Sequence, residues 1–286
     1  MPHRPTVLGR LFAISRPVLW VNTLGPALIG LWLTGDLWRW DFVPALLWLT
    51  LPFNLLIYGV NDISDQAVDE LSARKGSIEG ARIDPGEAPL IAAGVLVFNA
   101  PFAMWFAWHL PLEALGWMAA YAVVFVLYSL RPIRFKGRPF LDGLSNTAYA
   151  FPLVFVPLAF GVEPVWPAAL GLMMWAVAKH GYDAIQDLDE DREAGVKTTV
   201  VAVGVRGTLV WCASWWLASS VAFWLVSPWV ALVSGLFAAA LVAGVAARPT
   251  PARAHALYRV SIAYPYIAGG FAGVLLAASL TLDALR

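Results

Sequence analysis

Stretches of about 20 apolar residues recur along the whole chain, each long enough to cross a hydrocarbon layer about 30 Å thick. Their repetition restricts the fold more than any other feature. Within lipid the backbone must satisfy its own hydrogen bonds, so such stretches are expected to be helices. A soluble helical protein would show polar helix faces, and most of these stretches have none. The sequence therefore predicts an all-α polytopic membrane protein.

The apolar stretches predict nine membrane spans, which fits a composition that is 60% hydrophobic and 13% charged. The expected spans are 16–34, 42–61, 88–108, 113–131, 141–161, 165–186, 207–226, 229–247 and 260–281. Lys and Arg gather in alternate connecting segments. The positive-inside rule puts those segments in the cytoplasm, with the N-terminus inside and the C-terminus outside. We expect a multi-pass protein of the plasma membrane.

Charge and cysteine content exclude several other classes of protein. The chain has 19 Lys and Arg against 19 Asp and Glu, so nothing indicates a nucleic-acid partner. Its single cysteine, Cys212, lies in an apolar segment and excludes a disulfide framework. The first apolar run extends well past the core of a signal peptide, so it is interpreted as the first membrane helix.

Two acidic motifs lie at the ends of expected spans, about 120 residues apart. The first is Asn61-Asp62-x-x-Asp65-x-x-x-Asp69, and the second is Asp183-x-x-x-Asp187-x-x-x-Asp191. On a helix, the first spacing puts its carboxylates on one face, whereas the second drifts slowly around a face. Both motifs fall on the predicted cytoplasmic side, and each begins a long inner loop, 62–87 or 187–206. An acidic helix end in water explains either motif alone better than it explains the pair.

Scarce carboxylates gathered in two motifs indicate divalent cations. Magnesium takes carboxylate oxygens and usually keeps a phosphate-bearing substrate as a further ligand. The sequence therefore favours a membrane enzyme that handles a diphosphate. The candidate metal ligands are Asp62, Asp65, Asp69, Asp183, Asp187 and Asp191, of which Asp65, Asp69 and Asp187 are also the catalytic candidates.

Basic residues near the motifs are candidates for binding the diphosphate. Arg134 and Lys136 follow the fourth span, and Lys197 follows the second motif. Cations aimed at a diphosphate stabilise the charge that it develops as it leaves. Ordinary cytoplasmic charge is the alternative, which we prefer for Arg138. Lys179 lies within the sixth span, where an ionisable group is a functional candidate or the partner of an acidic neighbour.

Three further residues complete the expected site. Asn61 offers a neutral oxygen to a metal or an amide donor to a phosphate. Tyr58 and Tyr128 lie near cytoplasmic span ends, where their rings would either steady an allylic cation or belong to an interfacial aromatic belt.

Sequence similarity between the two motifs indicates an internal repeat. Tyr58-Gly59-x-Asn61-Asp62 resembles Gly181-Tyr182-Asp183. We expect a single domain over 1–286, built from two four-helix pseudo-repeats, roughly 10–135 and 140–255, with a ninth helix added. The two copies would face each other across one cavity.

The paired motifs resemble those of the UbiA superfamily of intramembrane prenyltransferases. The resemblance covers nearly the whole chain and includes Tyr128-Ser129 before the basic loop and Gly195-Val196-Lys197-Thr198-Thr199. It implies a helical bundle in which two Mg²⁺ ions hold a prenyl diphosphate between the motifs. It also implies a cytosolic cap formed by the long inner loops.

Segments outside the motifs resemble the lycopene elongases of C50 carotenoid synthesis. These segments are 15–23, 52–62, 74–81 and 134–142. The resemblance implies dimethylallyl diphosphate as donor, lycopene or a related carotenoid as the apolar acceptor from the bilayer, and association with other isoprenoid or carotenoid enzymes. In the implied reaction the acceptor attacks an allylic cation, and Asp69 or a phosphate oxygen removes the last proton.

Three alternatives were weighed against this interpretation. An aromatic quinone precursor or a glycerolipid as acceptor would use the same metal residues; an aromatic acid would favour an extra cavity arginine, of which the sequence gives no clear sign. A phosphatidyl-type alcohol transferase is excluded because Asp142-Gly143 precedes Leu144-Ser145 instead of Ala-Arg. An ion-coupled transporter is disfavoured because transporters place carboxylates near the bilayer midplane.

Overall fold

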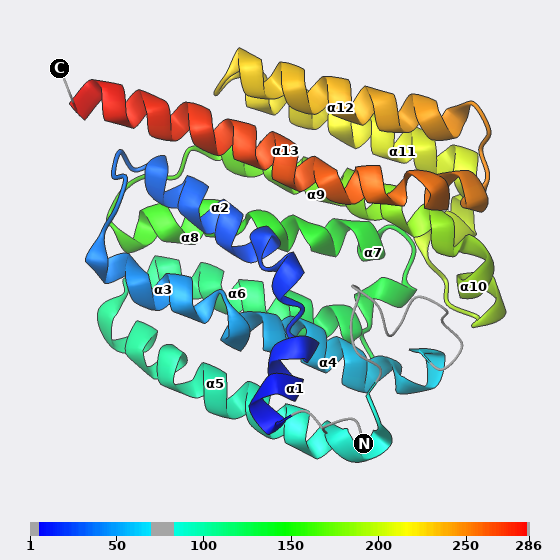
Figure 1. Cartoon of the computed structure of the whole chain (residues 1–286), viewed down its shortest axis with the longest axis horizontal. Coiled ribbons are helices and arrows are strands. Elements are labelled where there is room, and N and C mark those ends of the chain that lie inside the picture. The colour runs from blue at the N-terminus through cyan, green and yellow to red at the C-terminus, as the bar shows by residue number, and fades with distance from the viewer. Residues whose placement is uncertain (1–5, 70–82, 285–286) are drawn as a thin grey trace.

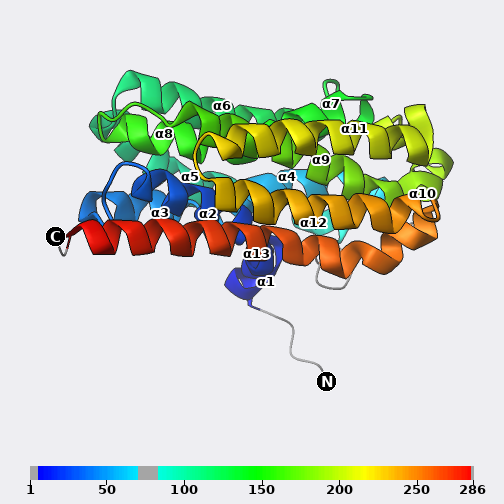
Figure 2. The ribbon, with the colours of Figure 1, turned by 90° about the horizontal axis from the view of Figure 1, so that it is seen from above.

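The computed structural model describes residues 6–69 and 83–284, and leaves the side chains of 66–69, Pro85 and Ala284 undescribed. Every regular element in these ranges is a helix, and they contain no strand. The long helices run side by side in one bundle (Figures 1 and 2). The prediction of an all-α fold is confirmed.

The first half of the bundle contains six longer helices and several single turns. In chain order its elements are α1 Val7–Ile14, η1 Pro17–Leu19, α2 Val21–Trp32, η2 Trp40–Phe42, α3 Val43–Trp48, α4 Leu51–Asp69, η3 Pro85–Glu87, α5 Ala88–His109, α6 Leu112–Ser129 and η4 Phe135–Gly137. The second half continues with α7 Leu141–Leu144, η5 Ser145–Ala150, α8 Pro152–Ala159, α9 Trp166–Ala184, η6 Ile185–Asp187, α10 Leu188–Glu193, α11 Thr199–Trp224, α12 Pro228–Ala246 and α13 Pro251–Ala284.

Six helical segments of the described chain are long and apolar enough to cross a membrane. They are Trp40–Asp65, which combines η2, α3 and part of α4, and Ala88–His109, Leu112–Ser129, Thr199–Trp224, Pro228–Ala246 and Pro251–Asp283. Their outer faces expose large apolar side chains such as Met104, Leu217 and Val274, as lipid-facing helices do. The chain is a multi-pass membrane protein.

The expected number of nine spans is not confirmed. Of the three remaining expected spans, 16–34 contains the short helix α2, and 165–186 contains α9. Lys179, His180 and Asp183 near the end of α9 lower its mean hydropathy. The third, 141–161, is divided among α7, η5 and α8.

Side-chain hydrogen bonds explain why the segment 141–161 is broken. Ser145 Oγ and Asn146 Nδ2 donate to the carbonyl oxygen of Asp142, at 3.1 and 2.7 Å, and Thr147 Oγ1 donates to Leu144 at 2.8 Å. Such local bonds compete with the regular helical ladder. Pro152 then begins α8 at its first turn, where a missing N–H is tolerated.

The two acidic motifs have different backbones. Helix α4 continues beyond the expected span end at 61 to Asp69, so the first motif lies on one helix as predicted. The second motif does not lie on one continuous helix, because α9 ends at Ala184 and a tighter 3₁₀ turn, η6, precedes α10. In this turn Gln186 Nε2 donates to the carbonyl of Asp183 at 3.1 Å, a further local side-chain bond.

Two large apolar cores lie on opposite sides of the bundle. One joins α2, α3, α4, α6 and α8 around residues such as Phe53 and Tyr121, and the other joins α9, α11, α12 and α13 around Trp216 and Tyr264. Backbones approach closely where α2 meets α8, since a Cβ on Gly30 would lie 2.8 Å from the carbonyl oxygen of Pro152. The boundary between the two cores passes through the centre of the bundle.

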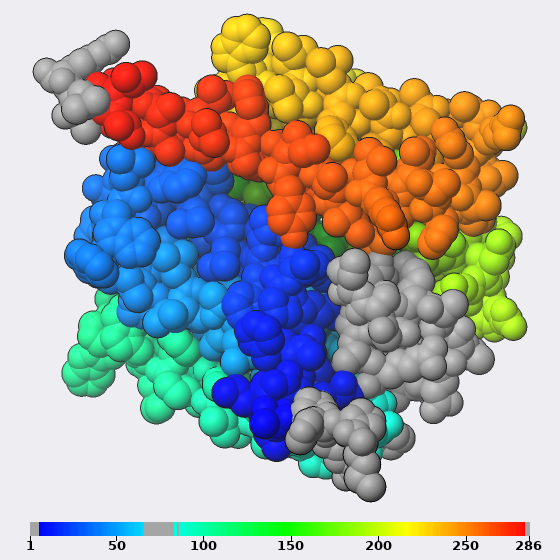
Figure 3. Space-filling model, viewed as in Figure 1, coloured from blue at the N-terminus to red at the C-terminus, as the bar shows by residue number. Residues whose placement is uncertain are grey.

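The N-terminal helix α1 packs on α4 and α5, where Leu11 and Ile14 are buried against Leu55 and Ile91. In Figure 3 the blue N-terminal residues run down the centre of the face, below the orange and red α13. Helix α1 is tied to the start of α5 by a bidentate ion pair, in which Arg10 Nε and Nη2 each lie 2.7 Å from an oxygen of Glu87. The hydrogen bond from Arg10 holds the pKa of Glu87 below its ordinary value.

This ion pair gives a small pH-dependent prediction. Because the pKa of folded Glu87 is lowered from 4.5, its contribution to stability is present above that value and is lost as the pH falls through the folded pKa. At pH 7 the free energy of unfolding of the wild type should exceed that of Glu87→Gln by about 1 kcal/mol or less, since the pair is partly exposed. Thermal unfolding of both proteins in detergent should show the gap closing at low pH. A gap that widens on acidification would contradict the assignment.

Candidate active site

A cavity of about 320 Å³ lies between the two cores. Both acidic motifs contribute to its wall, Asn61 from α4 and Asp183 and Asp187 from α9 and η6. The other lining residues are Arg16, Ile57, Tyr58, Phe125, Tyr128, Ser145, Asn146, Tyr149, His180, Ala184, Gln186 and Tyr258. Its volume is that of a small-molecule site, and its wall combines aromatic faces with convergent polar groups.

The first motif lies against the basic loop that follows α6. Asn61 Oδ1 accepts hydrogen bonds from Ser129 Oγ at 3.0 Å and from Lys136 Nζ at 2.9 Å. Asp65 accepts from Arg134 Nη2 at 3.1 Å and forms a second ion pair with Lys136. The structure therefore brings Arg134 and Lys136 to the first motif, as the sequence predicts.

Arg16 is a site residue that the charge pattern of the sequence does not distinguish from the other arginines of the predicted cytoplasmic side. Its Nη2 lies 2.6 Å from Oδ1 of the fully buried Asp62, and its guanidinium lies 4.6 Å from the ring centroid of Tyr58. Arg16 also lines the cavity. The only sequence signal was its place in the segment 15–23 that resembles the elongases.

Arg16 and Arg134, the two arginines that contact the first motif, both have a strained backbone. Arg16 has a φ of 52° and Arg134 a φ of 41°, in the left-handed region that side chains rarely adopt. Such conformations cost about 1–3 kcal/mol each and persist where surrounding contacts fix them. Here each strained residue directs its guanidinium onto a carboxylate of the first motif.

Replacing Arg16 should destabilise the protein strongly. Arg16→Gln removes one partner of a buried ion pair, which is expected to cost about 3–5 kcal/mol. Arg10→Gln is a matched control, because its ion pair with Glu87 lies nearer the surface and should be worth about 1 kcal/mol or less. Thermal unfolding in detergent compares the two variants. Equal losses would show that the Arg16 pair is not a structural element of the site.

The second motif lies across the cavity. Asp183 pairs with Lys179 one turn earlier and accepts a hydrogen bond at 2.6 Å from Ser261 Oγ of α13. Asp187 lines the cavity from η6. Lys179 thus has the acidic partner that the sequence analysis considered, and Ser261 is a contact that it did not foresee.

Of the predicted site residues, the described chain places Tyr58, Asn61, Tyr128, Asp183 and Asp187 in the cavity wall. Asp62, Asp65, Arg134, Lys136 and Lys179 form ion pairs and are not among the residues that line the cavity. Three further predicted residues are not in the wall either. Lys197 is exposed. Asp191 accepts a hydrogen bond from Thr198 Oγ1 at 2.9 Å, beyond the residues that line the cavity. Asp69 ends α4, but its side chain is outside the described residues, as are Arg74 and Lys75.

Two buried contacts fix the frame of the site. Asp142, which the sequence analysis used only to exclude another enzyme class, accepts a hydrogen bond at 2.7 Å from the backbone N–H of Thr199 and another from its hydroxyl. It thereby joins α7 to the start of α11. The sequence offers Tyr149 and Tyr182 as further aromatic candidates for the cavity. Tyr149 lines it, whereas Tyr182 is packed in the second core and donates to the carbonyl of Leu241 at 3.2 Å.

The donor set fits magnesium when a substrate is also a ligand. All motif oxygens are hard carboxylate or amide donors. Each of Asp62, Asp65 and Asp183 is paired with a cationic side chain, so a metal ion would share or displace that cation. No three His, Cys, Asp or Glu of the described residues lie close enough together to hold a metal ion. Magnesium commonly takes only one or two carboxylates and completes its shell with phosphate oxygens and water.

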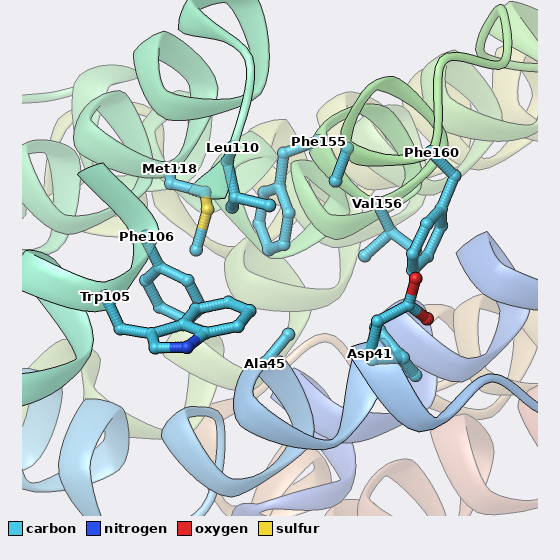
Figure 4. A pocket seen from close by; sticks show the side chains of 11 residues that line it. Asp41, Ala45, Trp105, Phe106, Leu110, Met118, Phe155, Val156 and Phe160 are labelled. Atoms are coloured by element: carbon cyan, nitrogen blue, oxygen red, sulfur yellow. The ribbon is translucent and has the colours of Figure 1, made fainter. Parts of the chain in front are cut away.

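A second, far smaller cavity has no comparable chemistry. It measures about 20 Å³ and lies at the other end of the bundle, among Trp105, Phe106, Met118 and Phe155. Figure 4 shows these apolar side chains around it, with Asp41 at one edge. A space of that size holds about one water molecule, so it is not a substrate site.

Known proteins resemble this chain in sequence over most of its length. A model described as the UbiA prenyltransferase family matches residues 23–263. A lycopene elongase/hydratase of Haloarcula japonica is 33% identical over 255 residues, which are 86% of this chain and 85% of the relative. One from Halobacterium salinarum is 36% identical over 221 residues, which are 76% of this chain and 79% of the relative.

A solved structure has the same fold. It is a UbiA homolog from Archaeoglobus fulgidus bound to DMAPP and Mg2+. It matches with a TM-score of 0.67 at 19% identity, covering 91% of this chain and 99% of the other.

Proposed function

Because the chain belongs to the UbiA prenyltransferase family, we propose that it moves a short allylic group from its diphosphate to a carotenoid, with lycopene as the leading acceptor. That the chain is an intramembrane prenyltransferase follows from the family and the two elongase relatives. The observation that carries the proposal is the cavity between the cores, because Asn61 of the first acidic motif and Asp183 and Asp187 of the second line it.

The donor and the metal are argued from the charges around this cavity. Dimethylallyl diphosphate is the proposed donor, and the homolog bound to DMAPP and Mg2+ supports a prenyl diphosphate and a divalent cation in this fold. Two Mg²⁺ ions would be held by Asp62, Asp65 and Asp69 on one side and by Asp183, Asp187 and Asp191 on the other. Bound Mg²⁺ would supply charge neutralisation of the diphosphate as its C–O bond breaks.

The chain's own cations and rings would perform the rest of this step. Lys136 and Arg134 already lie on Asp65, so their charges point to the place where diphosphate oxygens would enter. Lys197 is a more distant candidate for the same role. Tyr58 and Tyr128 line the cavity, and their aromatic rings would steady an allylic cation, although Arg16 already lies over the ring of Tyr58.

The acceptor would enter from the bilayer and attack the cation with its terminal double bond. The outward-facing side chains of the spans are apolar, which suits an acceptor dissolved in lipid. The two elongase relatives favour a carotenoid. We further propose that the diphosphate end of the cavity faces the cytoplasm, with the N-terminus inside, the C-terminus outside and the long inner loops as a cap.

The test is expression in a bacterial host that makes lycopene and dimethylallyl diphosphate but no other carotenoid. Mass analysis of extracted pigments should show lycopene gaining one or two C5 units. The Asp65→Ala variant, inserted to the same level, should leave lycopene unchanged. Unchanged lycopene with the wild-type protein would remove the carotenoid assignment.

An aromatic acid is a second candidate acceptor because of one observation. The expectation that the cavity has no arginine for a carboxylate is wrong, since Arg16 lines it. Arg16 is already paired with Asp62, which makes it less available to a substrate carboxylate. Feeding 4-hydroxybenzoate to the same host separates the candidates, because a prenylated phenol would then accumulate in place of an elongated carotenoid.

A further inference from the structure

His180 is a titratable residue of the cavity that the proposed mechanism does not yet use. It lines the cavity from α9. Its ring lies 6.0 Å from that of Tyr128, centroid to centroid, and almost perpendicular to it at 86°. Among the residues that the structure describes, no hydrogen bond to either ring nitrogen of His180 is formed, so the imidazole is available to a ligand or to water in the cavity.

The depth of His180 places it below the diphosphate site. It precedes Asp183 by three residues on the same helix, about 4.5 Å along the axis and on nearly the same face. Asp183 and Asp187 line the cavity, and the diphosphate would lie beside them if they hold the metal ions. The imidazole therefore stands at the level of the hydrocarbon part of the donor and of the acceptor carbon that it meets.

The reaction needs a proton acceptor at that level. When the acceptor double bond attacks C1 of the allylic group, one C–C bond forms and the adjacent acceptor carbon becomes a tertiary cation. That cation either loses a proton from a neighbouring carbon or binds a water molecule, which then loses a proton. In both outcomes one proton must leave near the acceptor carbon, away from the diphosphate.

The other polar groups of the wall suit this task less well. Asp183 has both oxygens engaged, one by Ser261 and one by Lys179, and Asp187 is a candidate metal ligand. Phenol groups such as Tyr149 and Tyr258 are poor acceptors because tyrosine ordinarily titrates near pH 10. Neutral imidazole accepts protons readily near neutral pH.

We propose that His180 accepts the last proton of the reaction, either from a carbon beside the tertiary cation or from the water that attacks it. This inference rests on the proposed carotenoid acceptor. The proton would pass to an imidazole nitrogen as the new C=C bond forms, or as the C–O bond of a tertiary alcohol forms. Released pyrophosphate or bulk water would then take it. His180 would thus set the ratio of unsaturated to hydroxylated product.

The test compares purified wild type with His180→Gln and His180→Phe, reconstituted with lycopene and dimethylallyl diphosphate. Pyrophosphate release reports C–O cleavage, and mass analysis reports each elongated carotenoid. We expect pyrophosphate release by both variants to stay within about threefold of wild type. The amount of elongated product per pyrophosphate should fall at least about tenfold, because loss of a general base typically lowers the rate of its step by 10²–10⁴-fold. The ratio of hydroxylated to unsaturated product should also change.

The controls separate this inference from the proposed function. His109→Gln is the matched control, since His109 lies exposed at the end of α5 and bonds only to its own helix in the described structure. It should behave as wild type. Wild-type product with an unchanged yield and product ratio in both His180 variants would overturn the role of His180 alone. Pyrophosphate release by wild type without any elongated carotenoid would overturn the acceptor assignment as well.

Discussion

Asp65→Ala is expected to abolish prenyl transfer while the protein stays folded. Asp65 forms ion pairs with both Arg134 and Lys136 and is a proposed magnesium ligand. Its loss would remove a metal contact and would release the two cations that would stabilise the leaving diphosphate. Losing transition-state charge stabilisation of this kind lowers turnover by at least about 10²–10³-fold. Product mass from dimethylallyl diphosphate and lycopene measures the effect.

A matched carboxylate elsewhere in the chain controls for the loss of an ion pair. Asp41 pairs with Arg39, with Nη2 and Oδ2 2.8 Å apart, far from the large cavity. Asp41→Ala should retain turnover within about twofold, because it touches no part of the proposed reaction and exposed pairs contribute little to stability. Full activity in Asp65→Ala, with normal insertion of both variants, would remove the metal-site hypothesis.

Lys136→Met is the second change with a large expected effect. The variant keeps the length and apolar stem of the side chain but removes the charge that links Asn61 to Asp65. Because Lys136 has no part in an apolar core, the loss should appear in turnover and in the KM for the diphosphate, by about 10²-fold in kcat/KM. Steady-state kinetics with varied dimethylallyl diphosphate measure it.

A neighbouring arginine gives the control for Lys136. Arg138 lies in the same loop, and its side chain donates to the carbonyl of Pro132 at 3.3 Å from an exposed position. Arg138→Met should leave kcat/KM nearly unchanged. Equal losses in the two variants would mean that the loop contributes only general positive charge.

The fold class could be predicted from the sequence because the lipid environment allows few solutions. Apolar runs of sufficient length must be helical in a bilayer, and this holds whatever their neighbours are. Breaks inside such runs depend on individual side chains, and these were not foreseen. Asn146 and Ser145 interrupt the segment 141–161 by bonding to one carbonyl oxygen, a local competition that hydropathy does not record.

The two acidic motifs likewise differ in how well the sequence predicts their backbone. The spacing of the first motif was sufficient because α4 continues through it to Asp69. The spacing of the second motif does not predict its backbone, because η6 interrupts it and leaves Asp187 in the cavity wall and Asp191 beside Thr198. A one-dimensional spacing cannot reveal a change from an α-helical to a 3₁₀ turn.

Residues from distant segments were the hardest to predict. Arg16 reaches Asp62 across 46 positions of sequence, and Ser261 reaches Asp183 across 78, so no local pattern connects either pair. Arg16 also depends on a strained backbone that spacing does not reveal. The four-helix pseudo-repeats, the pair of metal ions and the association with other carotenoid enzymes stay predictions.

Binding of dimethylallyl diphosphate to the purified protein tests most directly whether the two motifs form one metal-dependent site. Calorimetric titrations with Mg²⁺, with a chelator, and with the variants Asp65→Ala and Asp183→Ala should give saturable heat only for wild type with Mg²⁺. Loss in both variants is required, because Asp65 belongs to the first acidic motif and Asp183 to the second, and the account needs both motifs to form the site. Equal binding by wild type with and without the divalent cation would contradict the account.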